Sequence, residues 1–155
     1  MHIWIDADAC PRDAKDLVFR AAERLNIKTT LVANQTMRIP KSRWIELVLV
    51  PKGLDEADNY IADRVQPGDV VVAEDVPLSA RLVDAGATGI DPRGTIYTEE
   101  NVKQRLAARN LLADLREQGM MGGGPAPYKP KDRAKFASAL DRLLTQLLRN
   151  EKDPS

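Results

Sequence analysis

The feature that most constrains the fold is an alternation, along the chain, of short apolar segments with longer amphipathic segments. The apolar segments have the length of strands, and the amphipathic ones have the length of helices. Strand–helix–strand order favours a parallel sheet joined by right-handed crossovers. Strands are predicted at residues 3–5, 30–33, 45–50, 70–73 and 88–90, with a short sixth at 96–97. The sequence therefore predicts an α/β fold with a three-layer parallel sheet of about five strands, in the order 3-2-1-4-5.

Helices are predicted between these strands and again after the last of them. The first three span about residues 11–25, 54–65 and 78–85, and two extra C-terminal helices span about 98–118 and 132–148. A Gly- and Pro-rich segment separates the last two, and the final helix carries an apolar stripe of Phe136, Leu140, Leu143, Leu144, Leu147 and Leu148. We expect residues 1–149 to form one domain, with 98–149 as a helical extension packed on it and 150–155 as a flexible tail.

The composition favours a single core and argues against a disulfide-bonded or membrane-spanning protein. The chain has 155 residues, of which 43% are hydrophobic, and it carries 23 basic and 23 acidic side chains. No overall field therefore draws it to polyanions. Cys10 is the only cysteine, so no internal disulfide can form. No segment approaches the ~20 apolar residues of a membrane span, and the N-terminus lacks the pattern of a signal peptide, so we expect a cytoplasmic protein with no membrane partner.

Carboxylates follow two of the predicted strands. Asp6 and Asp8 leave the first strand, and Glu74 and Asp75 leave the fourth. With the predicted strand order these two strands are neighbours, and functional groups of open parallel sheets gather at the carboxyl ends of such strands. Adjacent strand residues face opposite sides, so Glu74 points either into this site or away from it.

Asp58 belongs to the same constellation although it lies in a helix. At 100° per residue, Asp58 falls within the apolar arc of the helix predicted at 54–65. That arc is defined by Leu54, Ala57, Ile61 and Val65. A carboxylate on the sheet-facing side of a helix, near the strand ends, is poorly explained as a solvated surface charge.

Carboxylates that converge in this way need compensation, because two unit charges ~4 Å apart repel by ~4 kcal/mol at an effective dielectric of ~20. Raised pKa values, an Arg or Lys partner, or a hard divalent cation would supply it, and oxygen-only ligation favours Mg²⁺ or Mn²⁺ over Zn²⁺. We expect Asp6, Asp8, Asp58 and Asp75 to be the metal ligands. Two structural alternatives remain: Asp8 could cap the helix that begins near Pro11, and Asp75 could cap the following helix.

Several segments resemble the bacterial YaiI/YqxD family, and the resemblance extends over nearly the whole chain to about Leu148. They are residues 5–11 (Ile-Asp-Ala-Asp-Ala-Cys-Pro), 53–61, 68–78, 92–94 and 122–125, together with Asp132, Arg133 and Phe136. The family is a domain of unknown function usually grouped with PIN-like nucleases. The resemblance implies a PIN-like sheet in which Asp6, Asp58 and Asp75 take the catalytic role of the acidic cluster of PIN-like ribonucleases, with Asp8 as an added ligand. Typical PIN domains end near their fifth strand, whereas this chain continues into two further helices.

The resulting hypothesis is a Mg²⁺- or Mn²⁺-dependent phosphodiesterase or ribonuclease, whose partner is RNA or another phosphate-containing substrate. The residues predicted to contact that substrate are Asn34, Arg93, Gly123, Lys129 and Arg133. Two of these assignments have plain structural alternatives. Asn34 could merely close a turn, and the glycine-rich segment around Gly123 could be a flexible connector.

Two other functions compete with this hypothesis. The first is a HAD-like phosphohydrolase with Asp6 as its nucleophile, because Asp6 and Asp8 have the spacing of that superfamily's catalytic pair. Against it, Cys10 stands where Thr or Val is usual, and Asp58 would have no role. The second is a non-catalytic metal- or RNA-binding module. Cys10 itself is interpreted as a packing residue, because the only histidine, His2, lies near the opposite end of the first strand.

Overall fold

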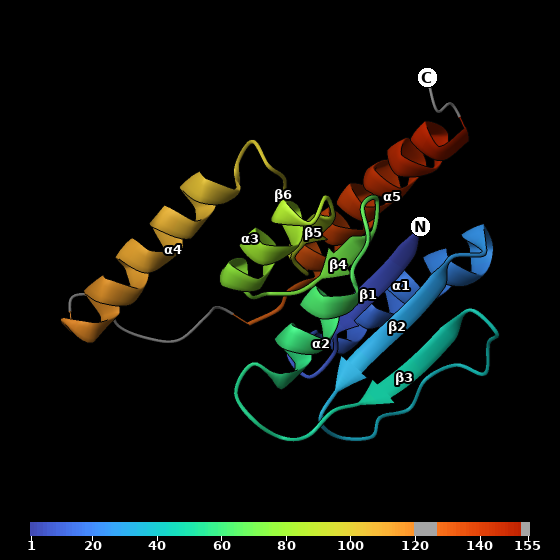
Figure 1. The fold of residues 1–155 in the computed structure, drawn as a ribbon, viewed down its shortest axis with the longest axis horizontal. Coiled ribbons are helices and arrows are strands. Elements are labelled where there is room, and N and C mark those ends of the chain that lie inside the picture. Colours follow the sequence, from blue (N-terminus) through green and yellow to red (C-terminus); the bar gives the residue numbers. More distant parts are fainter. Residues whose placement is uncertain (120–126, 153–155) are drawn as a thin grey trace.

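The structure is a computed structural model that describes residues 1–119 and 127–152 (Figure 1). Within these residues six strands form one sheet, in the order β3-β2-β1-β4-β5-β6. The strands are β1 (His2–Asp6), β2 (Lys28–Ala33), β3 (Ile45–Leu49), β4 (Val70–Val72), β5 (Thr88–Ile90) and β6 (Ile96–Tyr97). All neighbouring pairs are parallel except β5 and β6, which are antiparallel. The predicted order 3-2-1-4-5 is confirmed, and the short sixth strand extends it.

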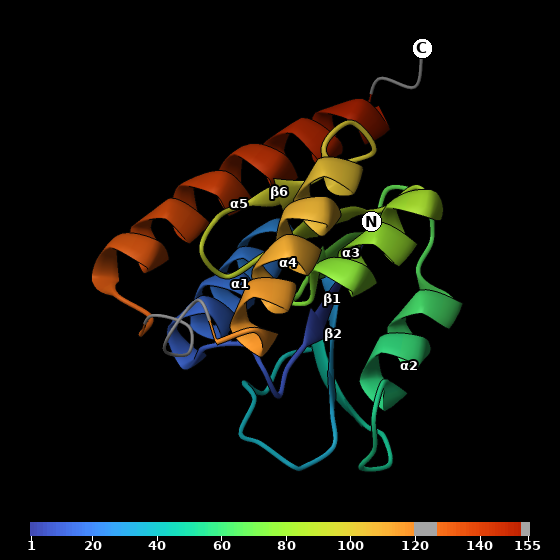
Figure 2. The same ribbon diagram turned by 90° about the vertical axis from the view of Figure 1, so that its left-hand side faces the viewer.

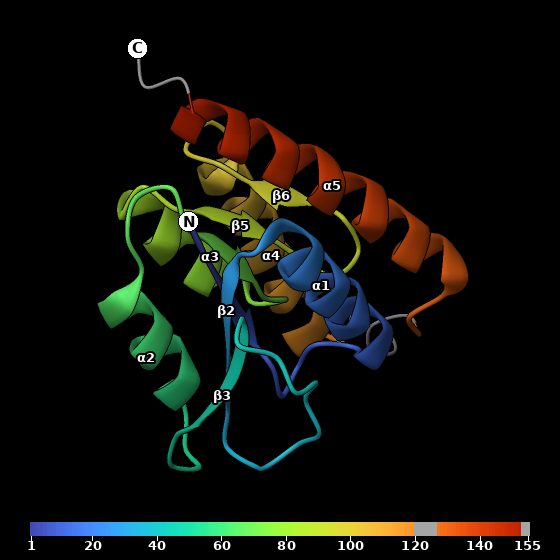
Figure 3. The same cartoon turned by 90° about the vertical axis from the view of Figure 1, so that its right-hand side faces the viewer.

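Helices cover both faces of the sheet, as the two side views show (Figures 2 and 3). One face packs against α1 (Arg12–Leu25) and α5 (Pro130–Lys152), and the other against α2 (Glu56–Arg64) and α3 (Val76–Asp84). The alternation of strand side chains produces this division. In β1, Ile3 and Ile5 join the core under α1 and α5, whereas Trp4 joins the core under α2 and α3. The predicted three-layer arrangement is therefore confirmed.

The two C-terminal helices pack in different ways. α5 buries Phe136, Leu140, Leu143 and Leu144 in the core, as its apolar stripe predicts. It continues to Lys152, beyond the end predicted near residue 148, and residues 153–155 of the predicted tail lie outside the described residues. α4 (Val102–Glu117) lies beside α3 and is exposed along most of its length (Figure 2). None of the described helices combines the length and apolar content that a membrane span needs.

A buried carboxylate ties the amino-terminal edge of the sheet together. Asp69, just before β4, is 4% exposed. Its Oδ1 accepts a hydrogen bond from the backbone N–H of His2 (3.0 Å), and its Oδ2 accepts from Trp4 Nε1 (3.2 Å) and the N–H of Gln66 (2.9 Å). Asp69 thus anchors β1 to β4 at the edge opposite to Asp6.

A close backbone approach fixes α3 against β5. A Cβ atom added to Gly89 would lie 2.9 Å from Ser79 Oγ, closer than real Cβ contacts allow. Ser79 is fully buried on the sheet-facing side of α3, and its backbone N–H donates to the carbonyl of Asp75. Only glycine lets the helix sit this close to the sheet.

Candidate carboxylate site

Three of the predicted site residues converge at the carboxyl edge of the sheet. Asp6 is the last residue of β1, and Asp75 directly precedes α3 after the neighbouring strand β4. Asp58 comes from the first turn of α2, which covers the same face as α3. The carboxyl ends of adjacent parallel strands and the start of one helix thus bring these side chains together, as the sequence predicts.

Asp75 has two partners. Its Oδ1 accepts a hydrogen bond from the N–H of Leu78 (3.1 Å), so it caps α3. Its carboxyl group is also hydrogen-bonded to that of Asp58. Capping by Asp75, considered above as an alternative to a site role, is confirmed, yet it leaves the carboxylate facing Asp58. A hydrogen bond between two carboxyl groups requires one of them to be protonated.

The environment of Asp58 increases its affinity for a proton. Burial raises its pKa to about 7, and the charges of Asp75, Asp6 and Asp55 and the hydrogen bond to Asp75 add to the effect. Asp6 behaves in the same way: burial, followed by the charges of Asp75, Asp8 and Glu74, raises its pKa to about 6. The charged groups that act on both residues are all carboxylates.

Among the described residues, no cation forms an ion pair with Asp6, Asp8, Asp58 or Asp75, although the charge of Arg93 favours the ionised form of the neighbouring Glu74. Ion pairs there join the Met1 amine to Glu151, Arg24 to Asp141 and Arg93 to Asp132, and none includes a member of the carboxylate cluster. An uncompensated cluster of this kind costs free energy, which protonation or a bound cation reduces.

The helix that carries Asp58 begins later than the sequence predicts. α2 starts at Glu56, and Leu54, placed above in its apolar arc, precedes the helix and is 93% exposed. Asp55, in between, adopts the left-handed conformation (φ 63°) that ends the preceding turn. Ile61 and Val65 still face the core, and Asp58 is half-buried on the same side. The predicted orientation of Asp58 holds without Leu54.

Asp8 and Asn34 complete one wall of the site. The predicted alternative that Asp8 caps α1 is wrong, because the residue at the cap position is Pro11 and no side chain bonds there. Asp8 Oδ2 instead accepts a hydrogen bond from the N–H of Asn34 (2.7 Å), across β1 and β2. Together with Asp6 and Asp58 they line a pocket of about 170 Å³, whose remaining wall is formed by Val50, Pro51, Gly53, Asp55, Glu56 and Ala57.

Val50, Pro51 and Gly53 are the part of that wall that sequence reasoning missed. They follow β3, a strand whose carboxyl end lies at the same sheet edge as those of β1 and β2. The predicted place of β3 beside β2 was therefore the feature of the sequence that could have indicated these residues.

The donor set fits a hard divalent cation. Asp6, Asp8, Asp58 and Asp75 offer only oxygen atoms, and burial and neighbouring carboxylates raise the pKa values of Asp6 and Asp58. In the part of the chain that the structure describes, no three His, Cys, Asp or Glu side chains already have the spacing of a metal centre. Cation binding would therefore require Asp58 to lose its proton and its hydrogen bond to Asp75.

The predicted substrate contacts from the C-terminal half lie outside this pocket. Arg93 Nη1 pairs with Asp132 Oδ2 (3.4 Å), and its guanidinium lies over the Tyr128 ring at 5.9 Å. The same Asp132 oxygen accepts the N–H of Lys129 (2.9 Å), so these residues join the loop after β5 to the start of α5. The Lys129 side chain is exposed and that of Arg133 half-exposed, and neither lines the pocket. Gly123 lies outside the described residues.

Cys10 is a packing residue, as the sequence analysis proposes. It is 7% exposed, and burial raises the pKa of its thiol to about 12, so that almost no thiolate forms at neutral pH. His2 is stacked on Trp4 (centroids 4.2 Å apart), and its Nε2 is 2.7 Å from Thr30 Oγ1. Since His2 begins β1 and Cys10 follows its far end, the two cannot act as a pair.

Comparison with known proteins identifies relatives along the whole chain. The family model described as "Uncharacterized BCR, YaiI/YqxD family" matches residues 4–146. A UPF0178 protein of Geobacter metallireducens is 51% identical over 155 residues, which is 100% of both chains. UPF0178 proteins of Citrifermentans bemidjiense and Myxococcus xanthus are 52% and 48% identical, covering 98% and 97% of this chain and 99% of each relative. No solved structure gives a significant match.

Proposed function

The chain belongs to the YaiI/YqxD family, and we propose that it is a PIN-like phosphodiesterase that cleaves RNA with the help of Mg²⁺ or Mn²⁺. One observation carries the proposal. Asp6 and Asp58 line the same pocket, and their pKa values are raised by burial and by further carboxylates, with no ion-pair partner in the described part of the chain. Such a cluster is stabilised by a divalent cation.

The residues of the site would have distinct roles. Asp6, Asp58 and Asp75 would hold the cation, with Asp8 as a further ligand. Bound there, the cation supplies a water of lowered pKa and offsets the charge of the scissile phosphate. Asp75 is fixed for this role by the Leu78 N–H, and Asp8 by the Asn34 N–H. The side-chain amide of Asn34, at the wall of the pocket, can donate a hydrogen bond to a phosphate oxygen.

The size of the pocket favours a substrate whose backbone is accessible. A volume of about 170 Å³ is smaller than the 300–1,000 Å³ typical of pockets that enclose a whole small molecule. It suffices for a phosphate group and its nearest atoms, while the rest of the substrate lies outside. A single-stranded polynucleotide presents its phosphates in this way.

Cleavage of labelled single-stranded and structured RNA, with Mn²⁺, Mg²⁺ or EDTA, tests the proposal. We expect cleavage only with the cation, and a loss of roughly 100-fold or more in Asp6→Asn and Asp58→Asn. The matched control is Asp63→Asn, which removes an exposed carboxylate from the same helix as Asp58 and should cleave like the unaltered protein. Cleavage at the unaltered rate by both site variants would refute the proposal.

The same samples separate the two competing functions. Acid-stable phosphate trapped on Asp6 after incubation with a phosphomonoester would indicate the HAD-like phosphohydrolase, for which Asp58 has no role. Tight RNA binding without cleavage under any cation would indicate the non-catalytic module. The position of Asp58 at the pocket favours the phosphodiesterase over the first of these.

A further inference from the structure

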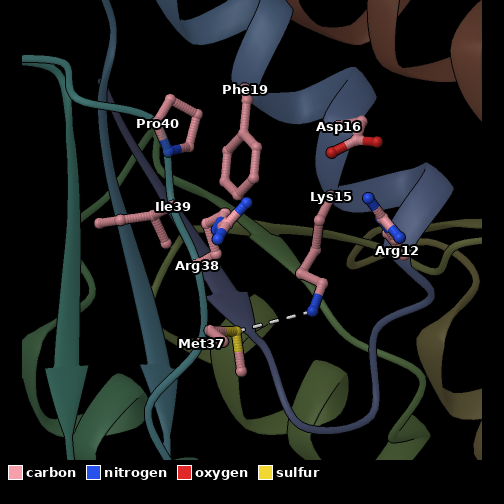
Figure 4. A pocket seen from close by; sticks show the side chains of 8 residues that line it. All are labelled: Arg12, Lys15, Asp16, Phe19, Met37, Arg38, Ile39 and Pro40. Carbon is pink, nitrogen blue, oxygen red and sulfur yellow. Dashed lines mark hydrogen bonds between the residues drawn. The ribbon is translucent and has the colours of Figure 1, made fainter.

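A second, larger pocket lies between α1 and the loop that joins β2 to β3 (Figure 4). Its volume is about 610 Å³. Three cationic side chains, Arg12, Lys15 and Arg38, and one anionic side chain, Asp16, belong to its lining. Within the described residues none of the three cations takes part in an ion pair. The pocket therefore has an excess of positive charge in a chain whose net charge is zero.

The rest of the lining is apolar. Phe19 contributes from α1, and Met37, Ile39 and Pro40 contribute from the loop. Lys15 and Met37 reach toward each other from opposite sides of the pocket (Figure 4), and Lys15 Nζ donates to Met37 Sδ at 3.6 Å. A thioether is a weak acceptor, so the ammonium group would readily exchange it for a phosphate oxygen. Cations over an apolar surface match the phosphate and base of a nucleotide.

This pocket adjoins the carboxylate site. Arg12, which lines this pocket at the start of α1, follows Asp6 at the end of β1 by only six residues, and the charges of Lys15, Glu74 and Asp6 all act on the pKa of the buried Cys10 thiol in between. The loop after β2 also connects the two pockets: it begins at Asn34, which lines the carboxylate pocket, and leads to Met37, which lines the larger one. A strand of a few nucleotides could therefore contact both pockets.

We propose that the pocket formed by Arg12, Lys15 and Arg38 binds a nucleotide that flanks the scissile phosphate of single-stranded RNA. The cations would contact its phosphates, and the apolar surface would contact its base. The volume lies within the 300–1,000 Å³ range of pockets that hold small ligands, and the N-terminus of α1, where Arg12 and Lys15 lie, further favours an anion. The inference extends the proposed function, since it specifies how that substrate is held.

Binding measured without catalysis tests this inference separately. Fluorescence anisotropy of a labelled single-stranded RNA of about 12 nucleotides, in EDTA and at several salt concentrations, reports affinity and its salt dependence. We expect Lys15→Gln/Arg38→Gln to weaken binding roughly 10-fold or more, and to reduce the slope of log K against log salt by roughly 1.4, or about 0.7 per lost phosphate contact. Lys15→Arg, which keeps the charge, should retain most of the affinity.

The control is Arg20→Gln/Lys41→Gln, which removes one exposed cation from the same helix and one from the same loop. Neither residue lines this pocket, and the net charge changes equally. Equal weakening in the two double variants, unaltered binding by Lys15→Gln/Arg38→Gln, or no RNA binding by the unaltered protein would each overturn the inference. Pocket-dependent binding without cleavage would refute the proposed function alone, whereas cleavage with unaltered binding in Lys15→Gln/Arg38→Gln would refute the inference alone.

Discussion

Asp58, in the first turn of α2, is hydrogen-bonded through its carboxyl group to that of Asp75, the residue that caps α3. The two side chains can share this bond only while one of them carries a proton. Burial and neighbouring carboxylates raise the pKa of Asp58 to about 7, so that Asp58 is mostly protonated below neutral pH. The divalent cation proposed for this site would therefore compete with that proton for the same oxygen atoms.

The free energy of unfolding should depend on pH, because the folded state raises the pKa values of Asp6 and Asp58. The folded-state pKa values of Asp6 and Asp58, about 6 and about 7, lie above the ordinary value of 3.8. The folded state thus binds protons more tightly than the unfolded state, and the resulting stabilisation is complete below about pH 4 and lost as the pH rises through about 6 to 7. In EDTA we expect the free energy of unfolding from urea titrations to fall between about pH 4 and about pH 7.

His2 acts in the opposite direction, because burial lowers its pKa. Its stabilising contribution is complete above about pH 6.5 and is lost as the pH falls below that value through the lowered folded-state pKa. Asp6→Asn/Asp58→Asn retains His2 and so isolates the carboxylates: the fall in stability should be much smaller in this variant. The same pH slope in both proteins would show that the cluster does not determine it.

Removing one carboxylate should stabilise the protein in the absence of divalent cations. At about pH 8 in EDTA, Asp58→Asn removes a charge that Asp6 and Asp75 repel, and its amide can still donate to Asp75. Because the site is open to solvent, we expect a gain of only ~1 kcal/mol in urea titrations. Asp63→Asn, on the exposed side of α2, should change stability by less than ~0.5 kcal/mol. A loss of stability in Asp58→Asn would contradict the expected repulsion.

Cation binding should release protons. Mn²⁺ needs an ionised Asp58, so binding at about pH 6.5 should release up to roughly one proton, and binding at about pH 8.5 markedly less. Isothermal titration calorimetry in two buffers of different ionisation enthalpy measures this number. Binding of Mn²⁺ with no proton release at the lower pH would place the cation away from Asp58.

Asp69 should contribute to the stability of the fold and not to cation binding. Asp69→Ala leaves the N–H groups of His2, Trp4 Nε1 and Gln66 without their acceptor in a buried place. We expect a loss of ~3 kcal/mol in urea titrations. Affinity for Mn²⁺ in the folded protein should be unchanged, since Asp69 lies at the opposite edge of the sheet. If the Asp69→Ala protein were fully folded and yet bound Mn²⁺ much more weakly, Asp69 would belong to the site.

The fold was largely predictable because local sequence patterns indicate the order of its strands and helices. Apolar runs of strand length alternate with helical periodicity, and the burial of Ile3 and Ile5 on one face and Trp4 on the other follows from strand geometry. The ends of elements were less predictable. Leu54 matches the helical period of α2, but the left-handed backbone at Asp55 separates it from the helix. No periodicity carries that information.

The site was predictable where a single element determines it and unpredictable where two elements meet. Asp6 at a strand end and Asp58 on a helix face follow from their own segments. The bond from the Asn34 N–H to Asp8 depends on the register between β1 and β2, so spacing alone suggested a helix cap for Asp8 instead. The pocket beside α1 needs the path of residues 37–40 in space, which the sequence does not indicate.

The carboxylate site depends on Gly89, a residue outside the site, because Gly89 contacts Ser79 of the helix that Asp75 caps. A methyl group at Gly89 would push Ser79 outward, and Asp75 caps the same helix one turn earlier. The height of α3 above the sheet therefore sets whether Asp75 reaches Asp58. A genetic screen for inactive variants should recover substitutions at Gly89 together with those of the aspartates, although glycine carries no functional group of its own.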